Sequence, residues 1–166
     1  MQPLQFPAMS ELVAALSGVL NAREPLPGLV SAGQPTAGHF AALKRAGCDV
    51  VIDTRDPMEP QPFDPSQAVT AAGLEYINIP VPHSVPDDAT FERARREVGA
   101  ILNRGQRVFV YCNSGNRVGA VLIPFFVLDR GMSEDDAVLR AMQMGTRSTE
   151  LVEGARDYIR RKAPSR

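Results

Sequence analysis

Cysteine, net charge and long apolar runs are all scarce in this chain of 166 residues. Its two cysteines cannot build a disulfide framework, and the sequence has no Cys-x-x-Cys motif or Cys/His cluster that would indicate a metal site. A formal net charge of −1 gives no basis for nonspecific attraction to nucleic acid or to a membrane surface. The longest apolar run, from Val118 to Leu128, is too short to span a bilayer.

Basic residues are also missing from the N-terminal stretch, where the first one is Arg23. The chain therefore lacks the charged region that begins a secretory signal, and together with the low cysteine content this predicts a cytoplasmic protein. With 44% hydrophobic and 22% charged residues, the chain is long enough for one sizeable core and short for two. We expect an N-terminal helix and linker over residues 1–28, one domain over 29–162, and a tail over 163–166. No cofactor is expected.

Helix and strand patterns alternate along the sequence, which is typical of α/β proteins. Strands are predicted at 29–32, 48–55, 74–81 and 107–111. Helices are predicted at 11–22, about 36–47, 65–72, about 89–103, 117–130, from 133 onward, and 148–161. The order indicates a central, mainly parallel sheet of about four strands flanked by helices.

The most informative segment is VFVYCNSGNRVGAVLIPFFVL, residues 108–128, which reads as a buried strand, a glycine-containing turn and a buried helix. Cys112 and Arg117 bracket the turn. The N-terminus of the helix would stabilise a thiolate and bind an oxyanion. We therefore expect Cys112 to be a nucleophile and Arg117 to bind an anion. The backbone N–H groups of the turn would complete the cradle, and they belong to Asn113, Ser114, Gly115, Asn116, Arg117 and Val118.

Three further loops follow predicted strands and would rim the same turn, because ligands bind beyond the carboxyl ends of a parallel sheet. They are Gly33-Gln34-Pro35, the Asp53–Arg55 strand end with its proline-rich extension, and His83–Asp88. Arg55 either reaches the anion or pairs with Asp53. Glu59, in the proline-rich extension, either closes over a substrate or is a plain surface carboxylate.

The second cysteine, Cys48, begins its predicted strand and so lies at the opposite end of the sheet. Five residues of strand place it roughly 16 Å below the rim, too far for a disulfide with Cys112. We expect Cys48 to be a small buried core residue.

The segments SAGQPT, VVIDTRDPMEP, GLEYINIPV and YCNSGNRVGA resemble, in that order, the beta-lactamase-hydrolase-like proteins with a phosphatase-like domain, over about residues 30 to 145. The resemblance implies a dual-specificity-phosphatase-like fold, with Cys112 as nucleophile and Arg117 as the phosphate-binding arginine. It also implies a phosphorylated protein or small molecule as substrate. This fold usually supplies a general acid from the loop after the third strand, which favours Asp87, with Asp88 as its neighbour. Asp87 is also well placed to cap the following helix.

The sequence departs from tyrosine and dual-specificity phosphatases in two ways. Four residues separate Cys112 from Arg117, where those enzymes usually have five, and four is the spacing of common rhodanese loops. Tyr111 and Val118 stand where those phosphatases tend to have histidine and a hydroxyl residue. Three functions stay open: an atypical cysteine phosphatase, a rhodanese-like sulfurtransferase that carries a persulfide on Cys112, and a noncatalytic anion-binding module. The sequence leaves the oligomeric state undefined.

Overall fold

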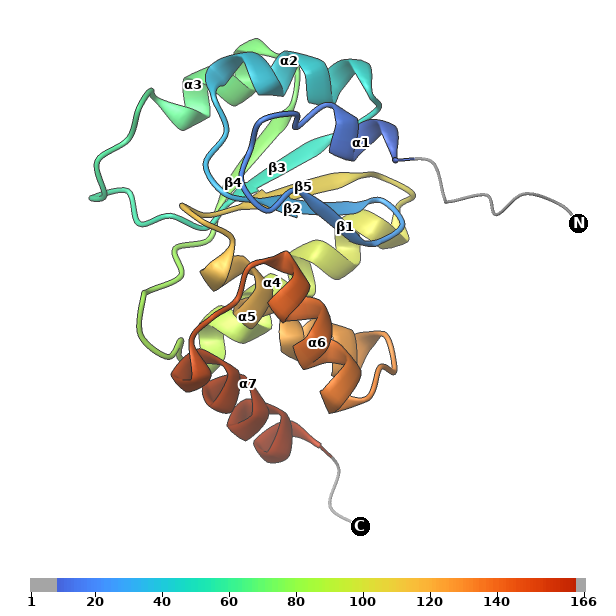
Figure 1. Ribbon diagram of the computed structural model, residues 1–166, viewed down its shortest axis with the longest axis vertical. Coiled ribbons are helices and arrows are strands. Elements are labelled where there is room, and N and C mark those ends of the chain that lie inside the picture. Colours follow the sequence, from blue (N-terminus) through green and yellow to red (C-terminus); the bar gives the residue numbers. More distant parts are fainter. Residues whose placement is uncertain (1–8, 164–166) are drawn as a thin grey trace, which may run out of the picture.

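A mixed five-stranded sheet lies at the centre of the protein (Figure 1). The computed structural model describes residues 9–163. The strands are β1 (Arg23–Leu26), β2 (Leu29–Ala32), β3 (Val50–Asp53), β4 (Glu75–Asn78) and β5 (Val108–Tyr111). Their order across the sheet is β1-β2-β5-β3-β4, and all neighbouring pairs are parallel except β1 with β2. The predicted α/β class with a mainly parallel sheet is confirmed, and β5 occupies its centre.

The fifth strand is the one that the sequence did not predict. β1 forms an antiparallel hairpin with β2, pairing Leu26 with Leu29, and lies at the edge of the sheet. The segment Glu24-Pro25-Leu26-Pro27-Gly28 reads as a break because proline lacks a backbone N–H. An edge strand tolerates proline, since one of its sides has no partner strand.

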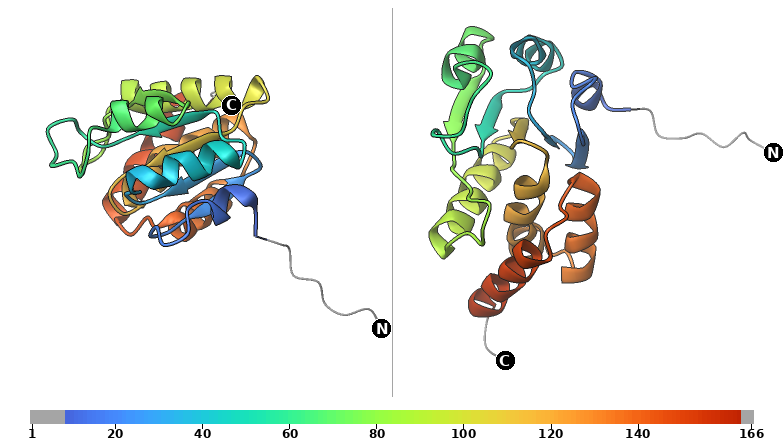
Figure 2. Two further views of the ribbon diagram at one scale, coloured as in Figure 1. Left: turned by 90° about the horizontal axis from the view of Figure 1, so that it is seen from above. Right: turned by 60° about the vertical axis from the view of Figure 1, so that its left-hand side comes forward.

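Helices cover both faces of the sheet and make a three-layer structure (Figures 1 and 2). One face carries α1 (Glu11–Ala14), α2 (Ala37–Arg45) and α3 (Pro65–Ala71). The other carries α4 (Asp88–Asn103), α5 (Asn116–Pro124), the π-helix η1 (Phe125–Asp129), α6 (Glu134–Met144) and α7 (Thr149–Lys162). β5 contributes to both cores, because alternate side chains of a strand point to opposite faces. Phe109 and Tyr111 pack with the first group of helices, whereas Val108, Val110 and Cys112 pack with the second.

Two helices differ from their predictions. The helix predicted over 11–22 ends at Ala14, and the next backbone hydrogen bonds, from Leu16 and Ser17, reach back three residues instead of four. The helix predicted over 117–130 is α-helical only to Pro124 and continues as η1. Proline has no N–H for the ladder, which explains why the regular hydrogen bonding changes there. The predicted domain boundaries at 28 and 163 stay predictions; residues 164–166 of the tail lie outside the described residues.

Ion pairs hold α7 against its neighbours. Arg161 lies 2.7 Å from Asp88 of α4, and Arg156 lies 3.4 Å from Glu134 of α6.

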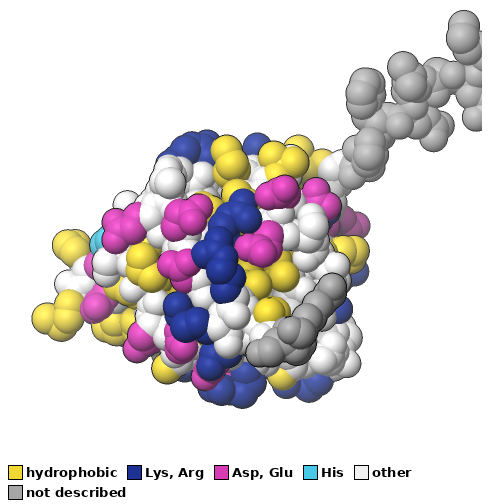
Figure 3. All heavy atoms as spheres, turned by 90° about the horizontal axis from the view of Figure 1, so that it is seen from below, with side chains coloured by type: hydrophobic (Ala, Val, Ile, Leu, Met, Phe, Trp, Pro, Cys, Tyr) yellow, Lys and Arg dark blue, Asp and Glu magenta, His cyan; other side chains and the backbone are white. Residues whose placement is uncertain are grey.

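On the face of the molecule seen from below, basic side chains form a band flanked by acidic ones (Figure 3). Within residues 9–163, no helix combines the length and the apolar character that a membrane crossing needs.

Candidate active site

The Cys112–Arg117 loop joins the end of β5 to the first turn of α5. Cys112 is fully buried, and the backbone N–H of Gly115 donates a hydrogen bond to its Sγ at 3.1 Å. Gly115 is the N-cap of α5 and has a φ of +98°, a left-handed conformation that glycine adopts readily. The sulfur thus lies at the N-terminus of a buried helix, where the partial positive charge of the helix stabilises a thiolate.

The carbonyl groups of this loop accept hydrogen bonds from residues outside it and so point away from the sulfur. Asn113 O accepts from the backbone N–H of Gln34 at 3.0 Å, and Asn116 O accepts from Thr146 Oγ1 at 3.0 Å. A Cβ on Gly33 would lie 2.8 Å from Asn113 O, so only glycine permits this close approach. Carbonyls held outward leave the N–H groups of the loop available on its inner side, as an anion cradle requires.

The side chain of Asn116 has a structural contact of its own. Its Oδ1 accepts from the backbone N–H groups of Arg147 at 2.8 Å and Ser148 at 3.3 Å. These residues connect α6 to α7. These bonds occupy Oδ1 of Asn116 and leave its backbone N–H available for the anion-binding role that the sequence predicts for it.

Arg117 is 2% exposed and bound in a fixed orientation. Its Nη1 and Nη2 donate to the two carboxylate oxygens of Glu59 at 2.7 and 3.0 Å, and Nη1 also donates to Val81 O at 3.2 Å. A guanidinium has five N–H donors. Among the contacts of residues 9–163, the Nε–H and the second Nη2–H of Arg117 have no partner. These two parallel donors form a fork that suits two oxygens of one phosphate.

Glu59 is the carboxylate that orients this guanidinium. Hydrogen bonds from Arg117 are the main reason why its pKa is lowered to about 2, and the backbone N–H of Asp56 adds to the effect. Its side chain is 19% exposed. The interpretation of Glu59 as a plain surface carboxylate is wrong, because it is bound within the candidate site.

Arg55 ties the proline-rich loop to the sheet. Its backbone N–H donates to Asp53 Oδ1 at 2.9 Å, and its guanidinium donates to Pro60 O at 2.9 Å, to the side chain of Gln34 and to Glu59 Oε1 at 3.5 Å. Arg55 thus contacts Asp53 through its backbone, and its guanidinium shares the carboxylate of Glu59 with Arg117. Its reach to a bound anion stays a prediction. Burial raises the pKa of Asp53, whose carboxylate also accepts from Tyr76 Oη at 2.8 Å.

Asp87 is the N-cap of α4. Its Oδ1 accepts from the backbone N–H of Thr90 at 2.9 Å and from Thr90 Oγ1 at 2.7 Å, and these bonds lower its pKa. None of the hydrogen bonds of Asp87 reaches Cys112 or Arg117. His83, four residues earlier in the same loop, lies 3.9 Å from Glu59.

Cys48 is fully buried, as predicted, and burial raises the pKa of its thiol to about 11. This thiol is therefore protonated and unreactive near neutral pH. The two cysteines differ in setting: Cys112 lies at a helix N-terminus, whereas Cys48 precedes β3 at the far end of the sheet.

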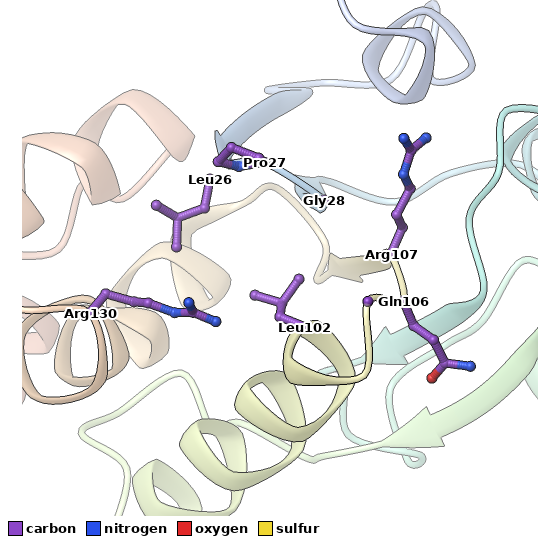
Figure 4. Close-up of a pocket in the computed structure, with 8 residues that line it drawn as sticks. Leu26, Pro27, Gly28, Leu102, Gln106, Arg107 and Arg130 are labelled. Atoms are coloured by element: carbon purple, nitrogen blue, oxygen red, sulfur yellow. The ribbon is translucent and has the colours of Figure 1, made fainter.

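A pocket of about 430 Å³ lies at that far end (Figure 4). The turn between β1 and β2, the end of α4 and Arg130 line it, and Arg130 points toward Leu102. It contains no nucleophile and none of the loop described above, so the Cys112 loop is the better candidate for chemistry. The described part of the chain holds no group of three His, Cys, Asp or Glu side chains arranged to bind a metal ion.

The carbonyls of the loop accept hydrogen bonds from the side chains of Asn21 and Thr146 and from the backbone of Gln34. The prediction that Gly33-Gln34-Pro35 borders this turn is confirmed. Nothing in the sequence pattern marks Asn21 or Thr146, which reach the loop only through the tertiary fold.

No protein-family model matches the chain, and no curated protein matches it. Solved structures do resemble it. Tk-PTP in its active form superposes with a TM-score of 0.75 at 18% identity, covering 85% of this chain and 97% of that one. A DUF442 protein from Shewanella putrefaciens CN-32 superposes with a TM-score of 0.74 at 23% identity, covering 90% of this chain and 97% of that one. PTPMT1 superposes with a TM-score of 0.72 at 15% identity, covering 84% of this chain and 94% of that one. The chain therefore has the fold of the protein tyrosine and dual-specificity phosphatases.

Proposed function

We propose that this protein is a cysteine-dependent phosphatase that hydrolyses a phosphoester through a phosphocysteine intermediate on Cys112. The observation that carries the proposal is the loop itself. A buried sulfur accepts an N–H at a helix N-terminus, and a buried arginine five residues later keeps a two-donor fork unused. The fold shared with phosphatases supports the same chemistry. The closer resemblance to beta-lactamase-hydrolase-like proteins stays a prediction.

In the first step, the Cys112 thiolate attacks phosphorus in line with the leaving oxygen. A P–S bond forms and the P–O bond breaks. The loop N–H groups and the free Arg117 fork hold the equatorial oxygens as charge develops on them. Asp87 is the proposed acid for the leaving oxygen, and it must release Thr90 to reach it.

In the second step, water attacks the phosphorus of phosphocysteine. The P–S bond breaks, inorganic phosphate leaves, and Cys112 returns to its thiolate form. The N–H of Gly115 stabilises the departing sulfur. Val118 offers no hydroxyl for this purpose, so we expect the second step to be the slower one.

The test is release of phosphate from an aryl phosphate in reducing buffer, between about pH 5 and pH 8. Cys112→Ser should abolish it. Cys48→Ser is the matched control, because that thiol is buried at the far end of the sheet, and it should leave the rate unchanged. Equal rates for the wild-type chain and Cys112→Ser would overturn the proposal.

A sulfurtransferase is the second candidate, and one observation favours it: the four-residue spacing between Cys112 and Arg117. In that chemistry Cys112 attacks the outer sulfur of thiosulfate, sulfite leaves, and a persulfide forms. Mass spectrometry after exposure to thiosulfate would show the added sulfur atom on Cys112. Binding of tungstate without either reaction would instead indicate a noncatalytic anion-binding module.

A cytoplasmic location stays a proposal, which cell fractionation would test.

A further inference from the structure

A side chain from the N-terminal segment holds the Cys112 loop from outside. Asn21 Nδ2 donates a hydrogen bond to Ser114 O at 2.8 Å, although 93 positions separate the two residues. Asn21 has a φ of +58°, and no other non-glycine residue within 9–163 has a positive φ. A left-handed conformation is costly for residues other than glycine, and asparagine tolerates it better than most.

The bond from Asn21 acts on the peptide unit that contacts the sulfur. Ser114 C=O and Gly115 N–H belong to one planar peptide group. Its oxygen accepts from Asn21, while its N–H donates to Cys112 Sγ at 3.1 Å. The group is thus held at both ends, and each hydrogen bond polarises the peptide in the sense that strengthens the other.

Two glycines enclose the side chain of Asn21. A Cβ on Gly145, at the end of α6, would lie 2.7 Å from Asn21 Nδ2. A Cβ on Gly115 would lie 3.4 Å from Asn21 Cβ and 2.5 Å from Met144 O. The preceding residue is also fixed, because Leu20 O accepts from the backbone N–H of Gly33 at 2.8 Å. The amide of Asn21 therefore has little freedom to turn away from Ser114.

We propose that Asn21 is a positioning residue, which keeps the Ser114–Gly115 peptide group turned with its N–H toward Cys112. Gly115 gives this group little resistance to rotation, since glycine permits many backbone conformations. A rotated group would present its carbonyl oxygen to the thiolate and to a bound anion, and repel both. The effect on phosphate turnover rests on the proposed function, whereas the effect on Cys112 does not.

The test compares Asn21→Gly with the wild-type chain. Glycine accepts the left-handed conformation, so this variant removes the amide donor without straining the backbone. Asn21→Asp is the second variant, because it keeps the size of the side chain but replaces its donor with an oxygen. Asn103→Gly, at an exposed asparagine that ends α4, is the matched control.

Two readouts follow the peptide group and its sulfur directly, and a third follows turnover. They are the Gly115 amide resonance in ¹⁵N-labelled protein, the rate at which iodoacetamide alkylates Cys112 near neutral pH, and kcat/KM for an aryl phosphate. Loss of one hydrogen bond predicts an alkylation rate and a kcat/KM each lowered about fivefold to tenfold in both Asn21 variants. The Gly115 resonance should shift, and Asn103→Gly should match the wild type. Cys48 does not interfere, because its raised pKa leaves it protonated.

An unchanged Gly115 resonance and an unchanged alkylation rate in Asn21→Gly would overturn this assignment, whatever the enzyme activity. A lower midpoint of thermal unfolding without a change in these two readouts would do the same, since it would show a purely structural role. If the wild-type chain fails to hydrolyse the aryl phosphate, the proposed function fails. The resonance and the alkylation rate still decide the role of Asn21 in that case.

Discussion

Glu59 and Arg117 form a two-point ion pair, with oxygen–nitrogen distances of 2.7 and 3.0 Å, between the loop after β3 and the first turn of α5. The pair uses the end of the guanidinium and leaves its side, Nε–H and one Nη2–H, free. The geometry of the ion pair therefore fixes the direction in which these two free donors point. Glu59 orients the arginine and leaves two donors for a substrate.

Replacing Glu59 should weaken catalysis through Arg117. In Glu59→Gln the second carboxylate oxygen becomes an NH₂ group, which cannot accept from Arg117, so the guanidinium loses its fixed direction. We expect kcat/KM for an aryl phosphate to fall about tenfold, as misplacement of a substrate-binding group does. Glu153→Gln, at an exposed carboxylate 3.9 Å from Arg156, is the matched control and should have no effect. A higher kcat/KM in Glu59→Gln would show instead that this carboxylate competes with phosphate.

The same ion pair should make the free energy of unfolding depend on pH only in acidic solution. The pKa of Glu59 is about 2 in the folded chain and ordinarily 4.5, so unfolding favours proton uptake. The contribution of the pair is then complete above about pH 5 and is lost as pH falls through 4.5 toward 2. Its size should be on the order of 1 kcal/mol after solvent screening. Urea unfolding of the wild type and Glu59→Gln should differ by a constant free energy above about pH 5, and the difference should shrink below that. A difference that persists to about pH 3 would contradict this assignment.

Asp87→Asn separates two roles of one side chain. Asparagine caps a helix about as well as aspartate, so the midpoint of thermal unfolding should stay unchanged. Loss of a proton donor should lower kcat/KM, which reports the first step, about 100-fold for an alkyl phosphate, whose leaving oxygen needs a proton, and much less for an activated aryl phosphate. Because hydrogen bonds from Thr90 lower the pKa of Asp87, the wild-type rate should also rise as the solution becomes more acidic. Equal kcat/KM values for wild type and variant on both substrates would assign Asp87 to capping alone.

The regular parts of the fold were predictable because their signals are local. β2 was predicted at its observed bounds, and α4 and α7 within one residue of theirs, since apolar periodicity marks them and Asp87 caps α4. The placement of Cys112 and Arg117 at the two ends of one loop was predictable for the same reason. A strand, a glycine turn and a helix determine it within one short segment.

The contacts that orient the loop were not predictable from such signals. Glu59 lies in a proline-rich loop without periodicity, and its bond to Arg117 depends on how that loop folds back over the sheet. Asn21 lies in a segment predicted as helix, but its left-handed conformation exists because the fold places Ser114 beside it. β1 was missed because Pro25 is unfavourable in a strand, unless that strand lies at an edge.

Val118 should limit the second chemical step, because it lies on the first turn of α5 without a hydroxyl to assist the departing Cys112 sulfur. Rapid mixing of the wild-type chain with an aryl phosphate should therefore show a burst of aryl alcohol followed by slower turnover. Val118→Thr has nearly the same shape and adds a donor, so the steady rate should rise about tenfold and the burst should shrink. Val118 is fully buried, and a hydroxyl there costs about 1–3 kcal/mol of stability, so the rates are compared well below the unfolding midpoint. Val118→Ala, which alters packing without adding a hydroxyl, is the control, and a steady rate as high as that of Val118→Thr would refute the role of the donor.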